Sequence, residues 1–326
     1  MSRVTKKFFG KKRNRFAVGT FLFLTFLSLT AEFWANSRPL ILKYHSEIFF
    51  PVLSEVAPTR LGITDQVVMD YRALKLGEKD WALWPLIAWD PYESNNAVER
   101  FPAPPSKVNL LGTDDRGRDL LARLLYGFRT SLLYAALVWV FAVIMGVGAG
   151  AKMGFFGGKI DFFGGRVIEV FHSVPLFFVL IIFSAFMEPS LWGLALLAGS
   201  LSWIGLSYYV RAEVLKNRKM PYVEAALSSG AGSWRVLLRH VLPNSLGPVI
   251  TLSPLIVSSH IVGLATLDFL GFGLAPPTPS WGELLNQAQK HFTTAWWLGV
   301  FPAGALFVTL ALLAVIGEGV RRARER

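Results

Sequence analysis

Hydrophobic stretches of 17 to 22 residues recur along this chain, and their length constrains its fold more than any other feature. A helix needs about 20 apolar residues to cross the hydrocarbon core of a bilayer, which is roughly 30 Å thick. With 53% hydrophobic and 17% charged residues, the 326-residue chain is also too apolar for an ordinary soluble protein. The sequence therefore predicts an all-α integral membrane protein with six transmembrane helices: Ala17–Phe33, Thr130–Ala151, Val167–Met187, Leu191–Val210, Leu246–Leu267 and Trp296–Gly317.

Positive charge is distributed unevenly between the pieces that separate these spans. If the N terminus is cytoplasmic, the internal pieces are 1–16, 152–169, 211–245 and 318–326, with 20 basic and six acidic residues. The external pieces hold 13 basic and 16 acidic residues. Cytoplasmic segments of membrane proteins carry the excess of Lys and Arg, so both termini are predicted to be cytoplasmic. This topology accounts for the formal net charge of +11 without nucleic acid as a partner.

Residues 35–129 form the one long polar insertion and carry 12 basic and 12 acidic residues. The segment "PLILKYHSEIFFPVL" predicts two short strands around a turn at His45–Ser46. Nearby tryptophans can form a small core or rest at the membrane interface: Trp81, Trp84 and Trp89. The insertion therefore predicts a small external lobe with short β strands between the first two helices.

The segment "LLGTDDRGRDLLARLLYGFRTSL" ends the lobe and predicts an amphipathic helix that leads into the second span. Thr113 or Asp114 can cap this helix by accepting a hydrogen bond from one of its first amide groups. Asp119 and Arg123 lie one turn apart and can form an ion pair. These charges predict a turn and a helix cap rather than a ligand site.

The segment "MPYVEAALSSGAGSWRVLLRHVLPN" predicts two short helices around a glycine. Pro221 suits a first helical turn, where its missing N–H costs nothing. Gly230 can take the left-handed conformation that ends a helix. Ser233 then caps a second helix over Trp234–Leu242, which Pro243 ends. Because so short a helix is unstable alone in water, the first helix is either a connecting loop with helical character or buried in a groove of another protein.

The spacing in this segment resembles the EAA loop of permeases from ATP-binding-cassette (ABC) importers. The residues that carry the resemblance are Glu224, Ala225, Ala226, Gly230, His240, Leu242 and Pro243. Other stretches, among them "GFFGGKIDFFGGRVIEVFHSVP" and "LDFLGFGLAPPTPSWGELL", resemble the oligopeptide/dipeptide permease family. The long lobe and "FPAPPSKVNLLGTD" are most similar to the Yej-type permeases of microcin C and oligopeptide importers.

This resemblance implies a type I ABC importer permease fold in four parts. These are a cytoplasmic N terminus with the first transmembrane helix (1–34), a periplasmic lobe (35–129), a core (130–317) with the coupling loop 211–245, and a basic tail (318–326). Ala225 and Ala226 would lie in a helix that docks on the ATPase, and Glu224 would pair with a basic residue there. Gly230 would set the turn, and the residues from His240 to Pro243 would tie the docking helix to the fifth span.

The resemblance also implies the partners and the location. The chain would work in a bacterial inner membrane with a second permease subunit, two ABC ATPase domains and a periplasmic solute-binding protein. It contains no G-x4-G-K-[ST] phosphate-binding loop, so ATP and magnesium would bind to the partner subunits and this chain would hold no cofactor or metal. The cargo would be an oligopeptide or a peptide-like compound, of the microcin C type in one reading. The alternatives are a permease for nickel or a metallophore, an ion-driven transporter, and a membrane-anchored sensor or enzyme that uses the lobe.

Polar side chains within the predicted spans are candidates for the transport pathway, because ionisable groups inside a membrane are commonly functional. The candidates are Glu169, His172, Ser258, Ser259 and His260. Two of them also have plainer interpretations. Glu169 can pair with Arg166 at the membrane surface, and His260 can satisfy groups freed by a kink at Pro254.

Overall fold

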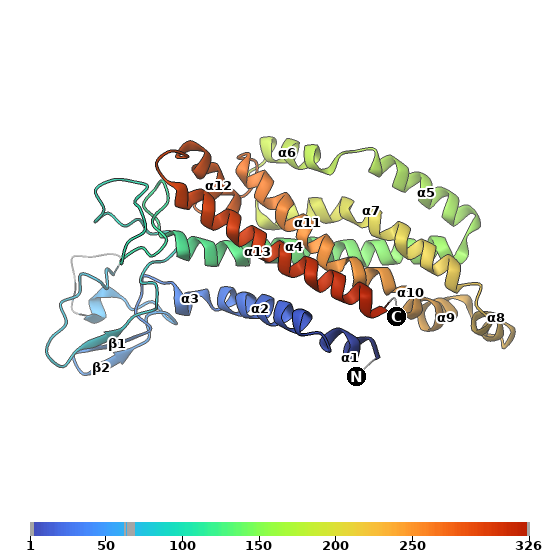
Figure 1. Cartoon of the computed structure of the whole chain (residues 1–326), viewed down its shortest axis with the longest axis horizontal. Coiled ribbons are helices and arrows are strands. Elements are labelled where there is room, and N and C mark those ends of the chain that lie inside the picture. The colour runs from blue at the N-terminus through green and yellow to red at the C-terminus, as the bar shows by residue number, and fades with distance from the viewer. Residues whose placement is uncertain (1–2, 62, 64–68, 325–326) are drawn as a thin grey trace. The chain divides into compact units, whose positions relative to one another are not determined.

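The computed structural model describes residues 3–61, 63 and 69–324, which form helices and three short strands (Figure 1). The chain divides into two compact units: unit 1 contains residues 1–21, 131–275 and 307–326, and unit 2 contains residues 22–130 and 276–306. The strands are β1 (Ile41–Tyr44), β2 (Glu47–Phe49) and β3 (Trp81–Leu83), with a 3-10 turn at Pro58–Leu61. The helices are α1 (Arg3–Phe9), α2 (Lys12–Leu29), α3 (Ala31–Trp34), α4 (Leu120–Phe156), α5 (Gly158–His172), α6 (Leu176–Phe186), α7 (Leu191–Asn217), α8 (Pro221–Ser228), α9 (Ser233–Val236), α10 (Leu242–Ser245), α11 (Gly247–Phe269), α12 (Trp281–Lys290) and α13 (Trp296–Arg324), and a π-helical turn, η2, covers Leu237–Val241.

Four helices in the described part of the chain are long and apolar enough to cross a membrane, namely α4, α7, α11 and α13. They correspond to the second, fourth, fifth and sixth predicted spans, and the all-α class with short strands is confirmed. The predicted first span corresponds to α2 and α3, which are separated by a break at Thr30. Since α2 carries Lys12, Arg13 and Arg15 in its first turn and is not one of the four, a crossing by Ala17–Phe33 stays a prediction.

The predicted third span, Val167–Met187, is not one straight helix. It consists of α5 and α6, which meet at a bend of 60° (Figure 1). The break falls just before Pro175, whose ring disfavours helical geometry in the preceding residue and which has no N–H for a helical hydrogen bond. If this bent pair is one crossing, the described residues contain five.

Within unit 1, α4 and α7 approach each other through a row of glycines on α4. The row is Gly146, Gly150 and Gly154, one residue in every four, so the three glycines lie on one face of the helix. A Cβ atom at these positions would lie 2.9, 2.5 and 2.7 Å from backbone carbonyl oxygens of α7. Such contacts leave no room for a side chain, and small residues that allow close backbone contact are typical of helix pairs in membranes.

Two arginines at the end of α7 join this helix to its neighbours in unit 1. Arg211 donates two hydrogen bonds to the Asp161 carboxylate of α5, with 2.6 Å between Nη2 and Oδ2. Arg218 donates to the Phe155 carbonyl at 2.7 Å, which satisfies a carbonyl group at the free end of α4. The C-terminal ends of α4 and α7 and the N-terminal end of α5 are thus held together by charge-assisted hydrogen bonds.

Unit 2 contains a three-stranded antiparallel sheet in the order β2-β1-β3. The predicted hairpin at His45–Ser46 is confirmed: both residues have positive φ angles, 49° and 69°, as a two-residue hairpin turn of type I′ requires. The pairing of β3 with β1 was not predicted. The three tryptophans do not form one core, because Trp81 is exposed whereas Trp89 is buried beneath the guanidinium of Arg72, 3.8 Å from the ring centre.

Candidate functional site

The helix α8 follows α7 in unit 1 and has the ends that the sequence predicts. Pro221 is its first residue. Gly230 has a φ angle of +83°, and the amides of Gly230 and Ala231 donate to the carbonyls of Leu227 and Ala226 at 3.0 and 3.1 Å. This pair of bonds is a Schellman motif, which satisfies carbonyl groups at the end of a helix. The predicted stop at Gly230 is confirmed.

One buried residue anchors α8 while most of its surface is exposed. Val223 is fully buried in a cluster that also contains Val214 of α7, Val236 of α9 and Val241 of η2. Exposed side chains surround it on α8 and α9, and we call them the coupling surface: Tyr222, Glu224, Ala225, Leu227 and Trp234. A surface with one carboxylate, one small residue and three large apolar side chains fits a groove in another protein.

The segment after α8 differs from its prediction. Ser233 is the first residue of α9 rather than its cap, and the helical path continues through η2 and α10 past Pro243. A proline inside a helix has no N–H and its ring collides with the carbonyl four residues earlier. The turn before Pro243 widens to a π-turn, in which the Leu242 amide bonds to the Leu237 carbonyl, and a wider turn accommodates the ring. The prediction that Pro243 ends a helix is wrong.

Replacing Gly230 with alanine is expected to loosen α8. An L-residue in the left-handed region costs about 1–2 kcal/mol, and no atom lies within 4 Å of the new Cβ, so the effect comes from the backbone alone. Amide hydrogen exchange along α8 should accelerate at least about fivefold. The matched control is Gly232→Ala, because Gly232 has a φ angle of −63° and equally open space. Equal exchange rates in the two variants would refute the role of Gly230 as a left-handed stop.

The pathway candidates of the third predicted span lie on the surface of α5. Arg166 pairs with Glu169 at 2.5 Å, and both side chains are more than half exposed. The predicted ion pair between Arg166 and Glu169 is therefore confirmed. His172 is exposed at the end of α5, and the next residue, Ser173, donates to the Glu169 carbonyl.

Two of the candidates on α11 lie at an open hollow in unit 1. A hollow of about 340 Å³ between α7 and α11 is lined by Ser202, Gly205, Leu206, Tyr209, Leu252, Leu255, Ile256, Ser259 and His260. Ser259 and His260 are thus brought together, whereas Glu169 and His172 do not line this hollow. The hydroxyls of Ser258 and Ser259 donate to the Pro254 and Ile256 carbonyls, both at 2.8 Å. Their protons are used within the helix, and the side chains in the lining that can ionise are those of Tyr209 and His260.

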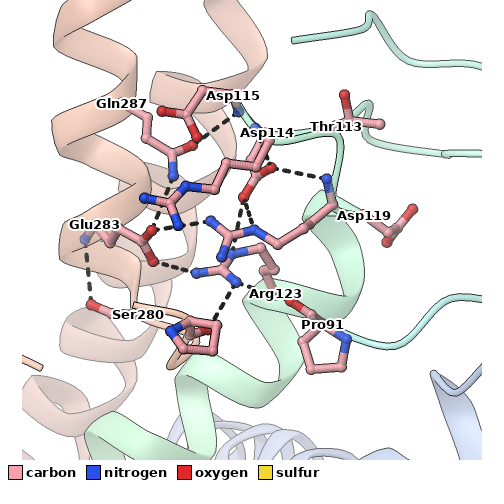
Figure 2. A network of polar contacts seen from close by, with 12 residues as sticks. Pro91, Thr113, Asp114, Asp115, Asp119, Arg123, Ser280, Glu283 and Gln287 are labelled. Carbon is pink, nitrogen blue, oxygen red and sulfur yellow. Dashed lines mark hydrogen bonds and ion pairs between the residues drawn. The ribbon is translucent and has the colours of Figure 1, made fainter. Parts of the chain in front are cut away.

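Unit 2 contains a buried charge network that the sequence did not reveal (Figure 2). Arg118 and Arg123 face the carboxylates of Asp114 and Glu283, and these four side chains are between 0 and 14% exposed. Arg118 donates to Asp114 at 2.6 Å and to Glu283 at 3.0 Å. Arg123 pairs with Asp114 at 3.3 Å and with the other Glu283 oxygen. Two positive and two negative charges balance, as burial of charge requires.

Backbone carbonyls and α12 complete the network. Arg123 also donates to the Pro91 carbonyl at 2.9 Å and contacts the Pro277 carbonyl at 3.3 Å. Ser280 caps α12 by accepting from the Gly282 amide at 3.1 Å, which fixes the helix turn that carries Glu283. Three separate stretches of unit 2 therefore meet at one guanidinium.

The predicted Asp119–Arg123 pair is wrong, and Asp119 points away from the guanidinium groups (Figure 2). Asp119 instead caps α4 by accepting from the Ala122 amide at 2.8 Å, and it also accepts from Asn109 at 2.9 Å. The cap is thus neither Thr113 nor Asp114. Burial raises the pKa of the Asp119 carboxyl, while these hydrogen bonds lower it in part. Burial and the neighbouring Asp114 charge raise the pKa of the Asp115 carboxyl.

The sequence matches a family model described as "Binding-protein-dependent transport system inner membrane component" over residues 126–323. It is 38% identical to the inner membrane ABC transporter permease protein YejE of Escherichia coli (strain K12), over 97% of this chain and 94% of the relative. It is 34% identical to the peptidoglycan transport system permease protein YejE of Agrobacterium fabrum, over 98% of this chain and 91% of the relative. It is 39% identical to the dipeptide transport system permease protein DppC of Escherichia coli (strain K12), over 67% and 73% of the two chains.

Among solved structures, the chain is similar to an inward-facing form of the MetNI methionine ABC transporter. The TM-score is 0.52 with 15% sequence identity, and the likeness covers 63% of this chain and 97% of the other. At 15% sequence identity, this likeness shows that the two chains share a fold. The predicted type I ABC importer permease fold is confirmed.

Proposed function

This chain belongs to the family of binding-protein-dependent transport system inner membrane components, and on that premise we propose that it forms part of the pathway by which an ABC importer takes up peptides. It is a multi-pass permease of the inner membrane. The observation that carries the proposal is α8, a helix of eight residues that is anchored by Val223, with Ala226 partly buried against the same cluster and the other side chains exposed. A helix this short persists only because the permease fold holds its inner face, which leaves its outer face for a partner.

Peptides are the substrate class that the relatives support. Two of them are named for the transport of dipeptides and of peptidoglycan, and both cargoes contain amino acids joined by amide bonds. The names of the two YejE permeases and of DppC mention neither nickel nor a metallophore, so the metal alternative is not favoured. We propose oligopeptides and peptide-bearing compounds as the cargo, and the microcin C type is one member of that class.

The energy of ATP hydrolysis would be passed to the permease at the coupling surface. Because the sequence has no phosphate-binding loop, ATP and magnesium would bind to two separate ATPase domains. Ala225 would seat in a cleft of one ATPase domain, and Glu224 would face a basic group, which contributes at most about 1 kcal/mol when exposed. Val223 and the cluster around η2 would pass movement of the ATPase to α7 and α11. The other partners would be a second permease subunit and a periplasmic solute-binding protein, with both termini cytoplasmic according to the charge count.

The hollow between α7 and α11 would lie on the route of the peptide. Ser259 and His260 face a space formed by two helices that both connect to the α8–α10 segment. Movement at the coupling surface would therefore change this hollow directly. Glu169 and His172 remain candidates by position in the sequence alone.

Reconstitution into proteoliposomes tests the proposal. The chain is assembled with the permease, ATPases and binding protein encoded beside it, and ATP hydrolysis is followed with a dipeptide, a longer peptide, a muropeptide or nickel. We expect at least one peptide cargo to stimulate hydrolysis through the binding protein and nickel to have no effect. Uptake driven by an ion gradient without ATP would contradict the proposal, as would stimulation by nickel alone.

A further inference from the structure

A pocket in unit 1 brings together residues from near both ends of the chain. Lys7 of α1, Lys11 of the following turn and Asn14 of α2 line one side, and Gly319, Arg322 and Ala323 line the other, from the end of α13. The space measures about 220 Å³. None of these residues belongs to the coupling surface or to the hollow between α7 and α11.

Asn14 shows that the lining of the pocket includes a buried polar side chain held in one orientation. Its side chain is only 1% exposed, and its Nδ2 donates to the Phe8 carbonyl at 3.0 Å. Because this bond fixes the orientation of the amide, the Oδ1 atom is the one that is left, and it has no hydrogen-bond partner among the described residues. A buried acceptor without a donor is costly, and because Asn14 lines the pocket we take a ligand there as the source of that donor.

Gly319 allows the two sides to come this close. A Cβ atom there would lie 2.6 Å from Nδ2 of Asn14 and 2.8 Å from the ring of Phe8. Any larger residue would therefore push α13 away from Asn14.

The charge of the pocket suits an anion. Lys7, Lys11 and Arg322 place three cations on its lining, and among the described residues Glu318 is a carboxylate that accepts hydrogen bonds from Arg321 and Arg322. A guanidinium has five N–H donors, so the bond to Glu318 leaves Arg322 with donors for another group. Cations with an additional hydrogen-bond acceptor match a phosphate group that is linked to a hydroxyl-bearing group.

The position of the pocket residues along the chain indicates that the anion is a lipid headgroup. Asn14 lies three residues before the apolar run Ala17–Phe33, and Gly319 lies two residues after the run Trp296–Gly317. The pocket therefore sits where both helices leave their apolar stretches. If Ala17–Phe33 crosses the bilayer as predicted, this is the level of the headgroups. Basic pockets between helices at this level bind the headgroups of anionic lipids.

We propose that this pocket binds the headgroup of an anionic phospholipid with a free hydroxyl, of which phosphatidylglycerol is the simplest example. The phosphate contacts Lys7, Lys11 and Arg322, and a headgroup hydroxyl donates to Oδ1 of Asn14. The lipid thereby joins the first helices of the chain to the end of α13.

Native mass spectrometry of the full chain, purified with its bound subunits and titrated with defined lipids, tests this proposal. Phosphatidylglycerol should bind about fivefold more tightly than phosphatidylmethanol, which has the same charge but no hydroxyl. The double variant Lys7→Gln/Lys11→Gln should bind phosphatidylglycerol about 25-fold more weakly, since each lysine near a membrane surface contributes about a fivefold factor. The matched control is Lys152→Gln/Lys159→Gln, which removes two exposed charges elsewhere in unit 1 and should bind like the parent.

Four results would each overturn the proposal. One is unchanged binding in the Lys7/Lys11 variant, and another is an equal loss in the control, which would indicate attraction by surface charge in general. If phosphatidylmethanol bound as tightly as phosphatidylglycerol, Asn14 would not be accepting a hydrogen bond from a headgroup hydroxyl. Displacement of the lipid by an equal concentration of glycerol 3-phosphate would show that the pocket serves a soluble phosphate instead.

Discussion

Replacing Arg123 with methionine is expected to lower the free energy of unfolding of unit 2 by about 3–5 kcal/mol. The variant leaves Asp114, which is fully buried, and Glu283, which is 14% exposed, with one cation between two carboxylates. It also removes the donor of the Pro91 carbonyl. Because a whole domain is stable by only about 5–15 kcal/mol, the loss should make much of the protein sensitive to protease or prevent it from reaching the membrane.

Thermal unfolding and limited proteolysis of purified protein in detergent measure this effect. The matched control is Arg116→Met, since Arg116 is exposed in the same loop and its loss should change stability by less than about 0.5 kcal/mol. Adding Glu283→Gln to Arg123→Met removes one unpaired charge and should recover part of the loss. If Arg123→Met melts like the parent, the network does not hold unit 2 together.

Replacing Ala225 with tryptophan should weaken the association with the ATPase about 100-fold and reduce ATP-dependent uptake accordingly. Ala225 is exposed on α8 and its side chain takes no part in the Val223 cluster, so the permease itself should remain folded. A large side chain at the centre of a helix that seats in a groove prevents close approach, whatever the charge of the partner.

Co-purification of the ATPase and its rate of hydrolysis in the assembled complex measure this second effect. The control is Lys159→Trp, which adds the same side chain at an exposed position of α5 outside the coupling surface. Normal ATPase binding by the Ala225 variant would exclude α8 as the docking helix. A matching loss in the control would show that any added tryptophan harms assembly.

Features set by neighbouring residues were predictable from the sequence. Pro221 and Gly230 determine where α8 begins and ends, because each acts through its own backbone conformation. The hairpin at His45–Ser46 and the apolar lengths of α4, α7, α11 and α13 belong to the same class. The motif in α8 could also be aligned with a family, since its spacing is local.

Features that depend on distant partners were not predictable. Arg123 has an acid four residues away in the sequence, but Glu283 on α12 and Asp114 in the preceding loop lie in better positions. The nearer acid, Asp119, is taken by the helix cap and by Asn109. In the same way, Pro243 would end an ordinary helix, and the widened turn before it, whose Leu237 and Val241 are buried in the Val223 cluster, lets the helix continue.

The row of glycines on α4 has a consequence for the transport cycle. Backbones in direct contact cannot slide by exchanging side-chain rotamers, and they cannot separate by a small amount without opening a void. The α4–α7 pair of unit 1 should therefore move as a single rigid body, with α8 fixed to its end. The changes of shape that open and close a passage are then expected elsewhere, and the 60° bend between α5 and α6 is a place where we expect such a change.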